Sequence, residues 1–470
     1  MAQRPLILES RLLRALCPLK PRLNHSYSIS TSRLPPSQPW PHYPASANVN
    51  DDQVARLAAK PLHPLTLADL VRYFNASLLI TRLLTLYFRH GRPPLCAKTL
   101  FDSANFTLSL LPIRLAHRIQ ALRNLPFIVV SNPYIAQIYS NYIHSLSTLL
   151  PYQERRITNL EDEIRFTEVM ADLVQTHSNT IPILARGFLE CRKYINPTDV
   201  TRFLDEHLRA RIGTRLIAEQ HIAFHLSSQP HNNGAETVQD SSSTHIGVID
   251  TALRPADIIR QCESYVSEIC ELKYGVRPTV VINGQPDTRL AHVPTHLEYI
   301  LTELLKNAFR ATIESGKERE PIEITIAASP DMSVGSHALP SEVDVEEEAL
   351  KHSGASANGR PVQSNPSIPG VTIRIRDRGG GISPEVLPNI WAYSFTTFGD
   401  DDVLDINNGN TDALNAISGA GGDSSSLAGL GYGLPLGRAY AEHFGGGIAV
   451  QSLWGWGTDV YLNLKGLGKI

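Results

Sequence analysis

The sequence of 470 residues has only five cysteines, and none of them stands in a CxxC pair. This spacing excludes a disulfide-rich scaffold and a zinc ribbon and predicts reduced thiols. Long apolar runs are also lacking, because Arg82 and the Asn132-Pro133 pair interrupt the longest ones. Positive charge is not in excess, since 43 Lys and Arg face 46 Asp and Glu, a formal net charge of -3. We therefore expect neither a membrane-spanning nor a nucleic-acid-binding protein.

The first forty residues differ in composition from the rest. They are rich in Arg, contain a single acid at Glu9, and run into a hydroxyl-rich stretch at residues 25–32. An Arg-rich, acid-poor segment that can form a short amphipathic helix is typical of a mitochondrial presequence, and a merely disordered N-terminus is the alternative. We therefore expect residues 1–40 to be a presequence.

Two globular regions follow, supported by an apolar content of 42%. Residues 64–228 carry apolar side chains at helical spacing, which predicts an antiparallel helix bundle of the four-helix type. After a polar junction, residues 245–466 mix strand-like and helix-like segments without a strict βαβ repeat, which predicts an α/β sandwich with one sheet covered by helices. The expected fold class is therefore two-domain, an all-α bundle followed by an α/β domain.

The expected elements follow from hydrophobic periodicity and turn signals. The helices are Leu67–Phe88, Leu111–Asn124, Asn132–Leu150, Glu161–Cys191, Thr198–His225, Pro255–Lys273, Thr295–Glu314, Pro384–Ile390 and Leu434–Phe444. The strands are Thr279–Ile282, Ile322–Ala327, Val371–Arg376, Gly447–Ser452 and Thr458–Leu464. Residues 331–370, which are acidic and lack aromatic side chains, predict a disordered surface insertion between two neighbouring strands.

A polar stripe is expected on the helix Thr295–Glu314. Its members are spaced at i, i+3, i+4 and i+7 and therefore share one helix face. They are Glu303, Lys306, Asn307 and Arg310. Taken alone, this stripe also fits an ordinary solvated face, with Glu303 and Lys306 as an ion pair.

Two glycine clusters and a hydroxyl complete the pattern. Asp377, Gly379 and Gly381 follow the strand that ends at Arg376. The glycines let the backbone approach a flat ligand closely, and the Asp377 carboxylate can accept a hydrogen bond from an exocyclic amine of that ligand. The second cluster opens a helix and presents backbone N–H groups to an anion. It consists of Gly429, Leu430, Gly431, Tyr432, Gly433 and Leu434. Thr458 begins the last strand, where its hydroxyl can stand behind Asp377.

The order of these four elements resembles the N, G1, G2 and terminal Thr sequence motifs of the GHKL ATPase superfamily. The HRD and DFG motifs of eukaryotic-type protein kinases and the Walker A loop are missing. The match narrows to the mitochondrial 2-oxoacid dehydrogenase kinases. It rests on His296–Thr312, Leu111–Ile119, Phe203–Asp205, Arg211–Arg215 and Tyr274-Gly275. Tyr299–Leu301, Ser394–Thr397 and Arg438–Glu442 resemble the branched-chain kinase more than the pyruvate dehydrogenase kinases. One difference is Tyr299, which stands where the pyruvate dehydrogenase kinases have a His, so that Tyr299 or His296 would have to assist Glu303.

The resemblance implies a mitochondrial matrix kinase that phosphorylates and inactivates the E1 subunit of a 2-oxoacid dehydrogenase complex, most similar to the branched-chain one. Glu303 would be the general base and Asn307 the ligand of Mg²⁺, and Lys306 and Arg310 would neutralise phosphate charge. The other expected ATP contacts are Asp377, Gly379, Gly381, Thr396, Thr397, the second glycine cluster and Thr458. K⁺ is a further cofactor that the family allows.

The resemblance also implies partners and regulation. The bundle would be regulatory and dock the lipoyl-bearing E2 core, the kinase would be a homodimer, and residues 399–429 would form an ATP lid. Arg211 and Arg215 lie one helical turn apart and would bind the carboxylate of an allosteric 2-oxoacid. The alternatives are a pyruvate dehydrogenase kinase and an ATP-gated, chaperone-like module without kinase activity. His221 and His225 would be buried bundle histidines or the vestige of a phosphohistidine relay.

Overall fold

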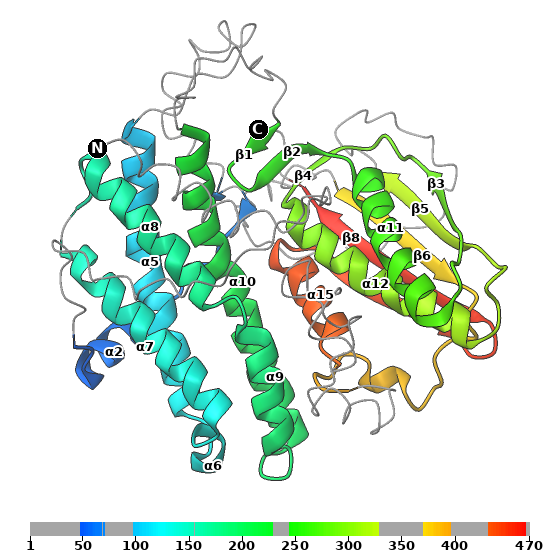
Figure 1. Cartoon of the computed structure of the whole chain (residues 1–470), viewed down its shortest axis with the longest axis horizontal. Helices are drawn as coiled ribbons and strands as arrows, with labels where there is room; N and C mark the ends of the chain where they lie inside the picture. The colour runs from blue at the N-terminus through cyan, green and yellow to red at the C-terminus, as the bar shows by residue number, and fades with distance from the viewer. Residues whose placement is uncertain are drawn as a thin grey trace, which may run out of the picture.

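The structure is a computed structural model of the whole chain and describes residues 48–67, 69–70, 97–154, 156–228, 244–328, 370–395 and 431–466. The expected presequence, the ATP lid, most of the helix Leu67–Phe88 and almost all of the insertion lie outside these residues. The described residues form a helical half and an α/β half that lie side by side (Figure 1). The two-domain fold class is therefore confirmed.

The helical half is an antiparallel bundle. Its helices are α2 (Asp51–Ala58), α5 (Ala97–Arg123), α6 (Phe127–Val130), α7 (Pro133–Gln153), α8 (Leu160–Thr176), α9 (Thr180–Cys191) and α10 (Pro197–Ser228). Local sequence explains two of the helix starts. The Asn132 side chain caps α7, with Pro133 in the first turn, and Asn159 caps α8 ahead of an acidic first turn. Among the described residues, no helix combines the length and apolar character that a bilayer crossing needs.

The prediction of one helix over Glu161–Cys191 is wrong. The chain turns after α8 and starts again at α9, with His177 as the C-cap of the first helix and Asn179 as the N-cap of the second. Between the helices, the Ser178 hydroxyl donates a 2.8 Å hydrogen bond to the carbonyl of Gln175, the competition for backbone groups by which Ser favours helix ends. Helix α5 also begins well before Leu111, with Pro112 inside it.

The α/β half contains two sheets. The larger has the order β3-β5-β6-β8-β7, parallel between β3 and β5 and antiparallel elsewhere. Its strands are β3 (Val280–Gly284), β5 (Ile322–Ala328), β6 (Gly370–Asp377), β7 (Gly447–Leu453) and β8 (Gly457–Lys465). The smaller sheet consists of β1 (His245–Ile246), β2 (Ile249–Leu253) and β4 (Leu290–His292), which sequence patterns did not predict.

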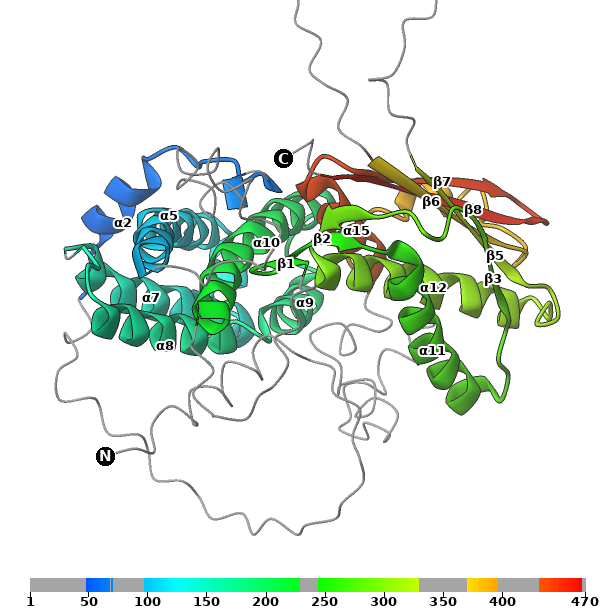
Figure 2. The same cartoon turned by 90° about the horizontal axis from the view of Figure 1, so that it is seen from above.

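The helices of this half are α11 (Pro255–Tyr274), α12 (Pro294–Glu314) and α15 (Gly433–His443). In Figure 2, α11 and α12 lie along one face of the large sheet. The helix expected at Pro384–Ile390 is wrong, because only a 3₁₀ turn forms at Leu387–Asn389. Pro388 inside it lacks the N–H that an α-helix requires.

Two hydrophobic cores meet at α15. One core fills the bundle and the other fills the space between the large sheet, α11 and α12. Leu436 and Ala439 of α15 belong to the bundle core, whereas Ala441 belongs to the α/β core. Helix α15 therefore packs between α10 and α12, as Figures 1 and 2 show. A segment that begins with Gly433 is thus held by both halves of the protein.

Candidate functional site

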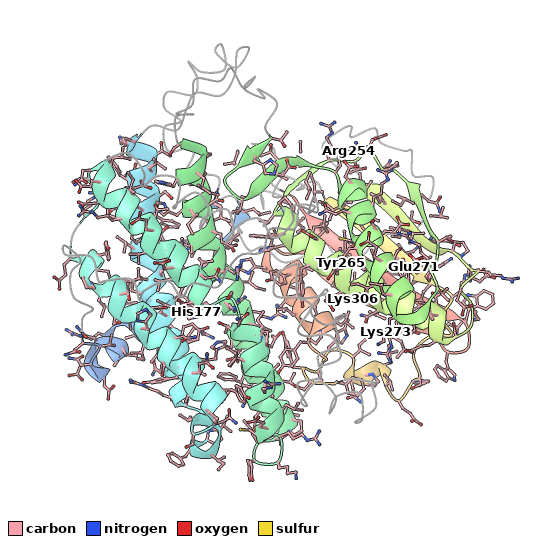
Figure 3. All side chains as sticks on the ribbon, viewed as in Figure 1. His177, Arg254, Tyr265, Glu271, Lys273 and Lys306 are labelled. Carbon is pink, nitrogen blue, oxygen red and sulfur yellow. The ribbon has the colours of Figure 1, made fainter. Side chains whose placement is uncertain are left out.

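The polar stripe of α12 lies where the helix spacing predicts it. Ile300, Leu301, Leu304, Leu305 and Ala308 on the opposite side are buried. Asn307 is exposed and Lys306 and Arg310 are half-buried. Figure 3 shows Lys306 on α12 in the α/β half. The apolar face therefore fixes the helix and leaves Lys306, Asn307 and Arg310 at least partly accessible at the surface of the α/β half.

Glu303 is the buried member of the stripe, with 9% of its surface exposed. Its Oε1 lies 2.5 Å from Lys306 Nζ, and a Cβ atom on Gly433 would collide with Oε2. The carboxylate therefore lies against the N-terminus of α15, where the helix dipole favours negative charge. Tyr265 of α11, which the sequence gave no reason to select, lies nearby: burial, and then the charges of Glu303 and Glu298, raise the pKa of its hydroxyl.

Asp377 lies at the end of β6 and is 6% exposed. Its Oδ1 accepts a hydrogen bond of 2.8 Å from the N–H of Gly379. Burial raises the pKa of Asp377, and hydrogen bonds from the backbone of Gly379 and Thr458 oppose that shift. Asp377 and Thr458 are direct partners in the pairing of β6 with β8. The carboxylate and the hydroxyl expected behind it are therefore neighbours.

A second hydroxyl supports this end of the site. Ser452 Oγ lies 3.2 Å from Thr458 Oγ1 and accepts a 2.7 Å hydrogen bond from the N–H of Ile382. A Cβ atom on Gly381, which has a φ of +75°, would collide with the carbonyl of Leu453. Sequence reasoning missed Ser452, and only the pairing of β7 with β8 brings it here.

The second glycine cluster is described from Gly431 onward. Gly431 has a φ of +74°, and a Cβ atom there would collide with the carbonyl of Phe395. Tyr432 is 1% exposed and its ring meets that of Tyr393 edge-on, with centroids 5.4 Å apart. Leu434 is partly buried against the α/β core. Thr396, Thr397, Gly429 and Leu430, also predicted to contact the nucleotide, lie outside the described residues.

The two glycine loops contact α12 at opposite ends of the stripe. Gly433 lies against Glu303, and a Cβ atom on Gly379 would lie 2.5 Å from Ala311 Cβ. These contacts bracket Lys306, Asn307 and Arg310 over about 12 Å of helix. The site therefore has the buried carboxylate of Asp377 at the Gly379 end, the cations Lys306 and Arg310 in the middle, and the N-terminus of α15 at the Gly433 end. This arrangement fits a nucleotide with a polyphosphate chain.

We expect Gly379→Ala to weaken ATP binding by about tenfold, because overpacking against the backbone of α12 would shift the loop. A Cβ atom at this position would lie 2.6 Å from the carbonyl carbon of Ala311. Gly380→Ala is the matched control: a Cβ there meets open space, but φ is +84°, so it costs about 1 kcal/mol of stability without touching α12. Calorimetric titration with ATP compares the two, and equal losses would contradict the prediction.

The two residues expected to assist Glu303 lie against α15. His296 is 7% exposed and packs on the rings of Tyr440 and Phe444, with centroids 4.7 and 5.9 Å away. Burial, followed by the charges of His292 and His443, holds the pKa of His296 well below its usual value. Tyr299 also packs on Tyr440, with ring centroids 5.0 Å apart. His296 is therefore packed among aromatic rings, and its burial favours the neutral form.

A second site lies inside the bundle. A cavity of about 60 Å³ is enclosed by α5, α7, α8 and α10, and both Arg211 and Arg215 line it. The Arg211 side chain donates a 2.9 Å hydrogen bond to the carbonyl of His177, and Arg215 Nε lies 2.7 Å from Glu219 Oε1. Most other lining side chains are apolar, with Tyr142, Ser145 and Thr214 as polar ones.

The cavity carries positive charge. His177, which Figure 3 shows in the bundle, lines the cavity, and its pKa is lowered to about 4 by burial and then by the charges of Arg211, His144 and Arg215. Its Nε2 lies 2.8 Å from the hydroxyl of Ser145. A neutral imidazole, hydroxyl groups and two guanidinium groups around an apolar space suit a small carboxylate.

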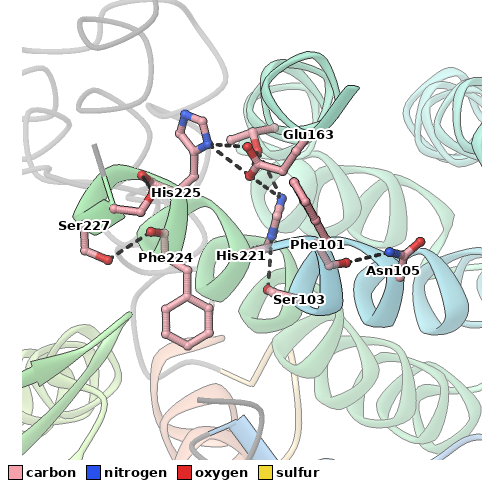
Figure 4. A network of polar contacts seen from close by, with 10 residues as sticks. Phe101, Ser103, Asn105, Glu163, His221, Phe224, His225 and Ser227 are labelled. Atoms are coloured by element: carbon pink, nitrogen blue, oxygen red, sulfur yellow. Dashed lines mark hydrogen bonds and ion pairs between the residues drawn. The ribbon is translucent and has the colours of Figure 1, made fainter. Parts of the chain in front are cut away.

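A buried polar network joins α5, α8 and α10 (Figure 4). Glu163, which is fully buried, accepts hydrogen bonds from His225 Nδ1 at 2.9 Å and Thr167 Oγ1 at 3.1 Å. His221 and His225 are 1% and 3% exposed. Both are therefore buried bundle histidines, and neither is accessible as a phosphate carrier.

Two protein-family models match this chain, one mainly in the helical half and one in the α/β half. Residues 81–250 match a family model described as mitochondrial branched-chain alpha-ketoacid dehydrogenase kinase. Residues 344–467 match one described as histidine kinase-, DNA gyrase B- and HSP90-like ATPase. The latter match contains Asp377, both glycine clusters and Thr458, so this half of the chain is an ATP-binding domain. Among the described residues, no group of three or more His, Cys, Asp or Glu side chains could hold a metal ion.

Similar proteins match most of the chain. The mitochondrial pyruvate dehydrogenase (acetyl-transferring) kinase 1 of Saccharomyces cerevisiae is 33% identical over 82% of this chain and 83% of its own length. The mitochondrial enzyme of Arabidopsis thaliana is 29% identical over 79% and 86%, and isozyme 4 of Homo sapiens is 27% identical over 84% and 86%. The chain therefore belongs to the mitochondrial 2-oxoacid dehydrogenase kinases, protein-serine kinases of the GHKL ATPase superfamily.

Proposed function

We propose that this kinase phosphorylates a serine of the E1 subunit of the pyruvate dehydrogenase complex in the mitochondrial matrix and so inactivates it. The observation that carries the proposal is similarity to pyruvate dehydrogenase kinases over more than four fifths of both lengths. The branched-chain substrate expected from the sequence is not confirmed, since only the family model for residues 81–250 bears that name. The lipoyl-bearing E2 core stays the expected partner of the bundle.

The geometry of the α12 stripe supports the following roles in phosphoryl transfer. Glu303, against the N-terminus of α15, would accept the proton of the serine hydroxyl as it attacks the γ-phosphate. Lys306 and Arg310 would neutralise charge on the phosphates, and Asp377 would bind adenine. Asn307 is exposed, and its carbonyl oxygen would hold Mg²⁺, a metal that prefers oxygen ligands and supplies further charge neutralisation.

Side-by-side labelling tests the substrate. The full chain is incubated with radioactive ATP and either the E1 of the pyruvate dehydrogenase complex or the E1 of the branched-chain complex. We expect phosphate on a serine of the pyruvate dehydrogenase E1. Faster labelling of the branched-chain E1 would contradict the substrate, and ATP hydrolysis without label on either protein would favour an ATP-gated module.

We also propose that a small 2-oxoacid inhibits the kinase from the bundle cavity. The guanidinium groups of Arg211 and Arg215 line an otherwise mostly apolar space of about 60 Å³. Burial, and then the charges of Arg211, His144 and Arg215, lower the pKa of His177 beside them. Because α10 also contacts α15, a ligand there can affect the helix that begins beside Glu303.

We expect Arg215→Ala to raise the inhibitory concentration of pyruvate or a branched-chain 2-oxoacid by about tenfold or more, because a charged hydrogen bond to the carboxylate is lost. Glu219→Ala is the matched control, since it removes the acid that pairs with Arg215 and should make inhibition equal or tighter. Inhibition is measured relative to the uninhibited rate of each variant. Unchanged inhibition of Arg215→Ala, or inhibition competitive with ATP, would place the ligand elsewhere.

A further inference from the structure

A groove of about 530 Å³ lies between the two halves of the protein. One wall is the first three turns of α10, from Pro197 to Arg209, and the other is formed by Asn389–Tyr393 and the start of α15. None of the residues assigned above to the nucleotide lines this groove. It is therefore a second space at the surface of α15, on the side of that helix that faces α10.

The groove opens close to the candidate base. Gly433, which lies against the carboxylate of Glu303, precedes by two residues Pro435, which lines the groove. On the other wall, the ring of Tyr393 contacts that of Tyr432, the residue just before Gly433. A chain lying in this groove would therefore pass within about one helical turn of the reacting end of the nucleotide site.

The lining is positively charged and aromatic. Arg202, Arg209 and Arg438 line the groove, and Asp205 is the only acid among the described residues that line it. One ion pair joins the walls: Arg209 Nη1 on α10 lies 2.7 Å from Glu442 Oε2 on α15. Within α10, Arg209 Nε also lies 2.7 Å from Asp205 Oδ2. Arg209 is thus structural. Arg438 Nε also pairs with Glu442 Oε1 at 2.7 Å, and Arg202 pairs with Asp199 at 2.7 Å, but the side chains of both arginines keep exposed surface that a ligand can contact.

Arg438 and Arg202 are placed to contact a ligand. The Arg438 side chain is 40% exposed and its guanidinium lies 4.9 Å from the centre of the Trp391 ring. The Trp391 ring holds the guanidinium of Arg438 in place. The planar edge of a guanidinium can bind a carboxylate through two parallel hydrogen bonds. Arg202 stands at the rim with 72% of its side chain exposed, and its partner Asp199 is itself 51% exposed.

We propose that this groove binds the segment of the protein substrate that carries the accepting serine, and that Arg438 and Arg202 select acidic side chains beside that serine. The inference rests on the proposed kinase function and adds the chemistry by which the substrate is chosen. A polypeptide fits the site because the groove has a volume of about 530 Å³, has walls from both halves, and ends two residues from Gly433, which lies against Glu303. An acidic polypeptide complements the excess of arginine along its walls.

Kinetics with the pyruvate dehydrogenase E1 test the groove. We expect Arg202→Glu and Arg438→Gln each to raise the KM for E1 by about tenfold, with the affinity for ATP unchanged, because each loses a contact to substrate carboxylates. Arg438→Gln also removes the pair of Arg438 with Glu442, but Glu442 keeps its ion pair with Arg209, so α10 and α15 stay joined. Arg260→Glu is the matched control: Arg260 is 55% exposed and pairs with Asp257 at i,i+3 as Arg202 does with Asp199, but it lies on α11. It should leave the KM for E1 unchanged.

Peptide binding separates this inference from the proposed function. Two short serine-containing peptides, one flanked by Asp and Glu and the other by Asn and Gln, are titrated calorimetrically into the full chain with a non-hydrolysable ATP analogue. We expect the acidic peptide to bind at least tenfold more tightly, and the preference to disappear in Arg202→Glu. Equal binding of both peptides, or an unchanged KM for E1 in the two groove variants, would overturn the groove assignment even if E1 is phosphorylated. If the acidic peptide binds selectively but no E1 is labelled, the proposed function is overturned, whereas the assignment of the groove as a site for acidic peptides stands.

Discussion

The Glu303→Gln variant is expected to transfer phosphate to E1 about a hundredfold or more slowly than the wild type, because an amide cannot accept the serine proton. The side chain keeps its size, so its contact with Gly433 is preserved. The ion pair with Lys306 at 2.5 Å is lost, which leaves Lys306 free to turn to the phosphates. We therefore expect the affinity for ATP to be equal or slightly higher.

Single-turnover phosphorylation and calorimetric ATP binding measure the two effects separately. Glu298→Gln is the matched control, because Glu298 is a half-buried carboxylate on the same helix and lies about one and a half turns before Glu303. Its rate should stay close to that of the wild type. Full activity in Glu303→Gln, or equal losses in both variants, would show that Glu303 is not the base.

The local part of the site could be predicted because it follows from spacing alone. Positions i, i+3, i+4 and i+7 of α12 share a face in any helix, so Glu303 and Asn307 fall on one stripe once the helix is known. Asp377 and Gly379 come directly after a strand with clear alternation, and the pairing of β5 with β6 confirms that these strands are neighbours across the long insertion.

The parts that depend on packing between distant segments could not be predicted. Ser452 reaches Thr458 only through the register of β7 and β8. The groove between α10 and α15 depends on residues more than two hundred positions apart, such as Arg209 and Glu442. Periodicity likewise cannot locate the turn at Asn179, since apolar residues continue at helical spacing on both sides of it.

The network around Glu163 is the other feature that only the tertiary structure reveals. The donor and acceptor of each of its hydrogen bonds can be assigned. His221 Nδ1 lies 3.1 Å from Ser103 Oγ, and its Nε2 lies 3.0 Å from Thr167 Oγ1. Thr167 donates its proton to Glu163, so its oxygen must accept from His221 Nε2, and the Ser103 hydroxyl then donates to Nδ1. Burial lowers the pKa of His221 to about 4 despite the charge of Glu163, and a neutral imidazole with its proton on Nε2 is the form that accepts from Ser103 at Nδ1. The carboxylate of Glu163 is held mainly by His225 and Thr167.

We expect Glu163→Ala to lower the free energy of unfolding by about 3–5 kcal/mol, because removing one partner of a buried pair leaves the other polar groups without compensation. Glu161→Ala provides the matched control on the same helix: Glu161 is 74% exposed and pairs with Arg165, so its loss should cost less than about 1 kcal/mol. Urea unfolding followed by circular dichroism compares the variants with the wild type. Because α8 and α10 also enclose the cavity lined by Arg211, the same variant should lose 2-oxoacid inhibition at temperatures where it stays folded. Equal small losses for Glu161→Ala and Glu163→Ala would show that the network is not a stabilising element of the bundle.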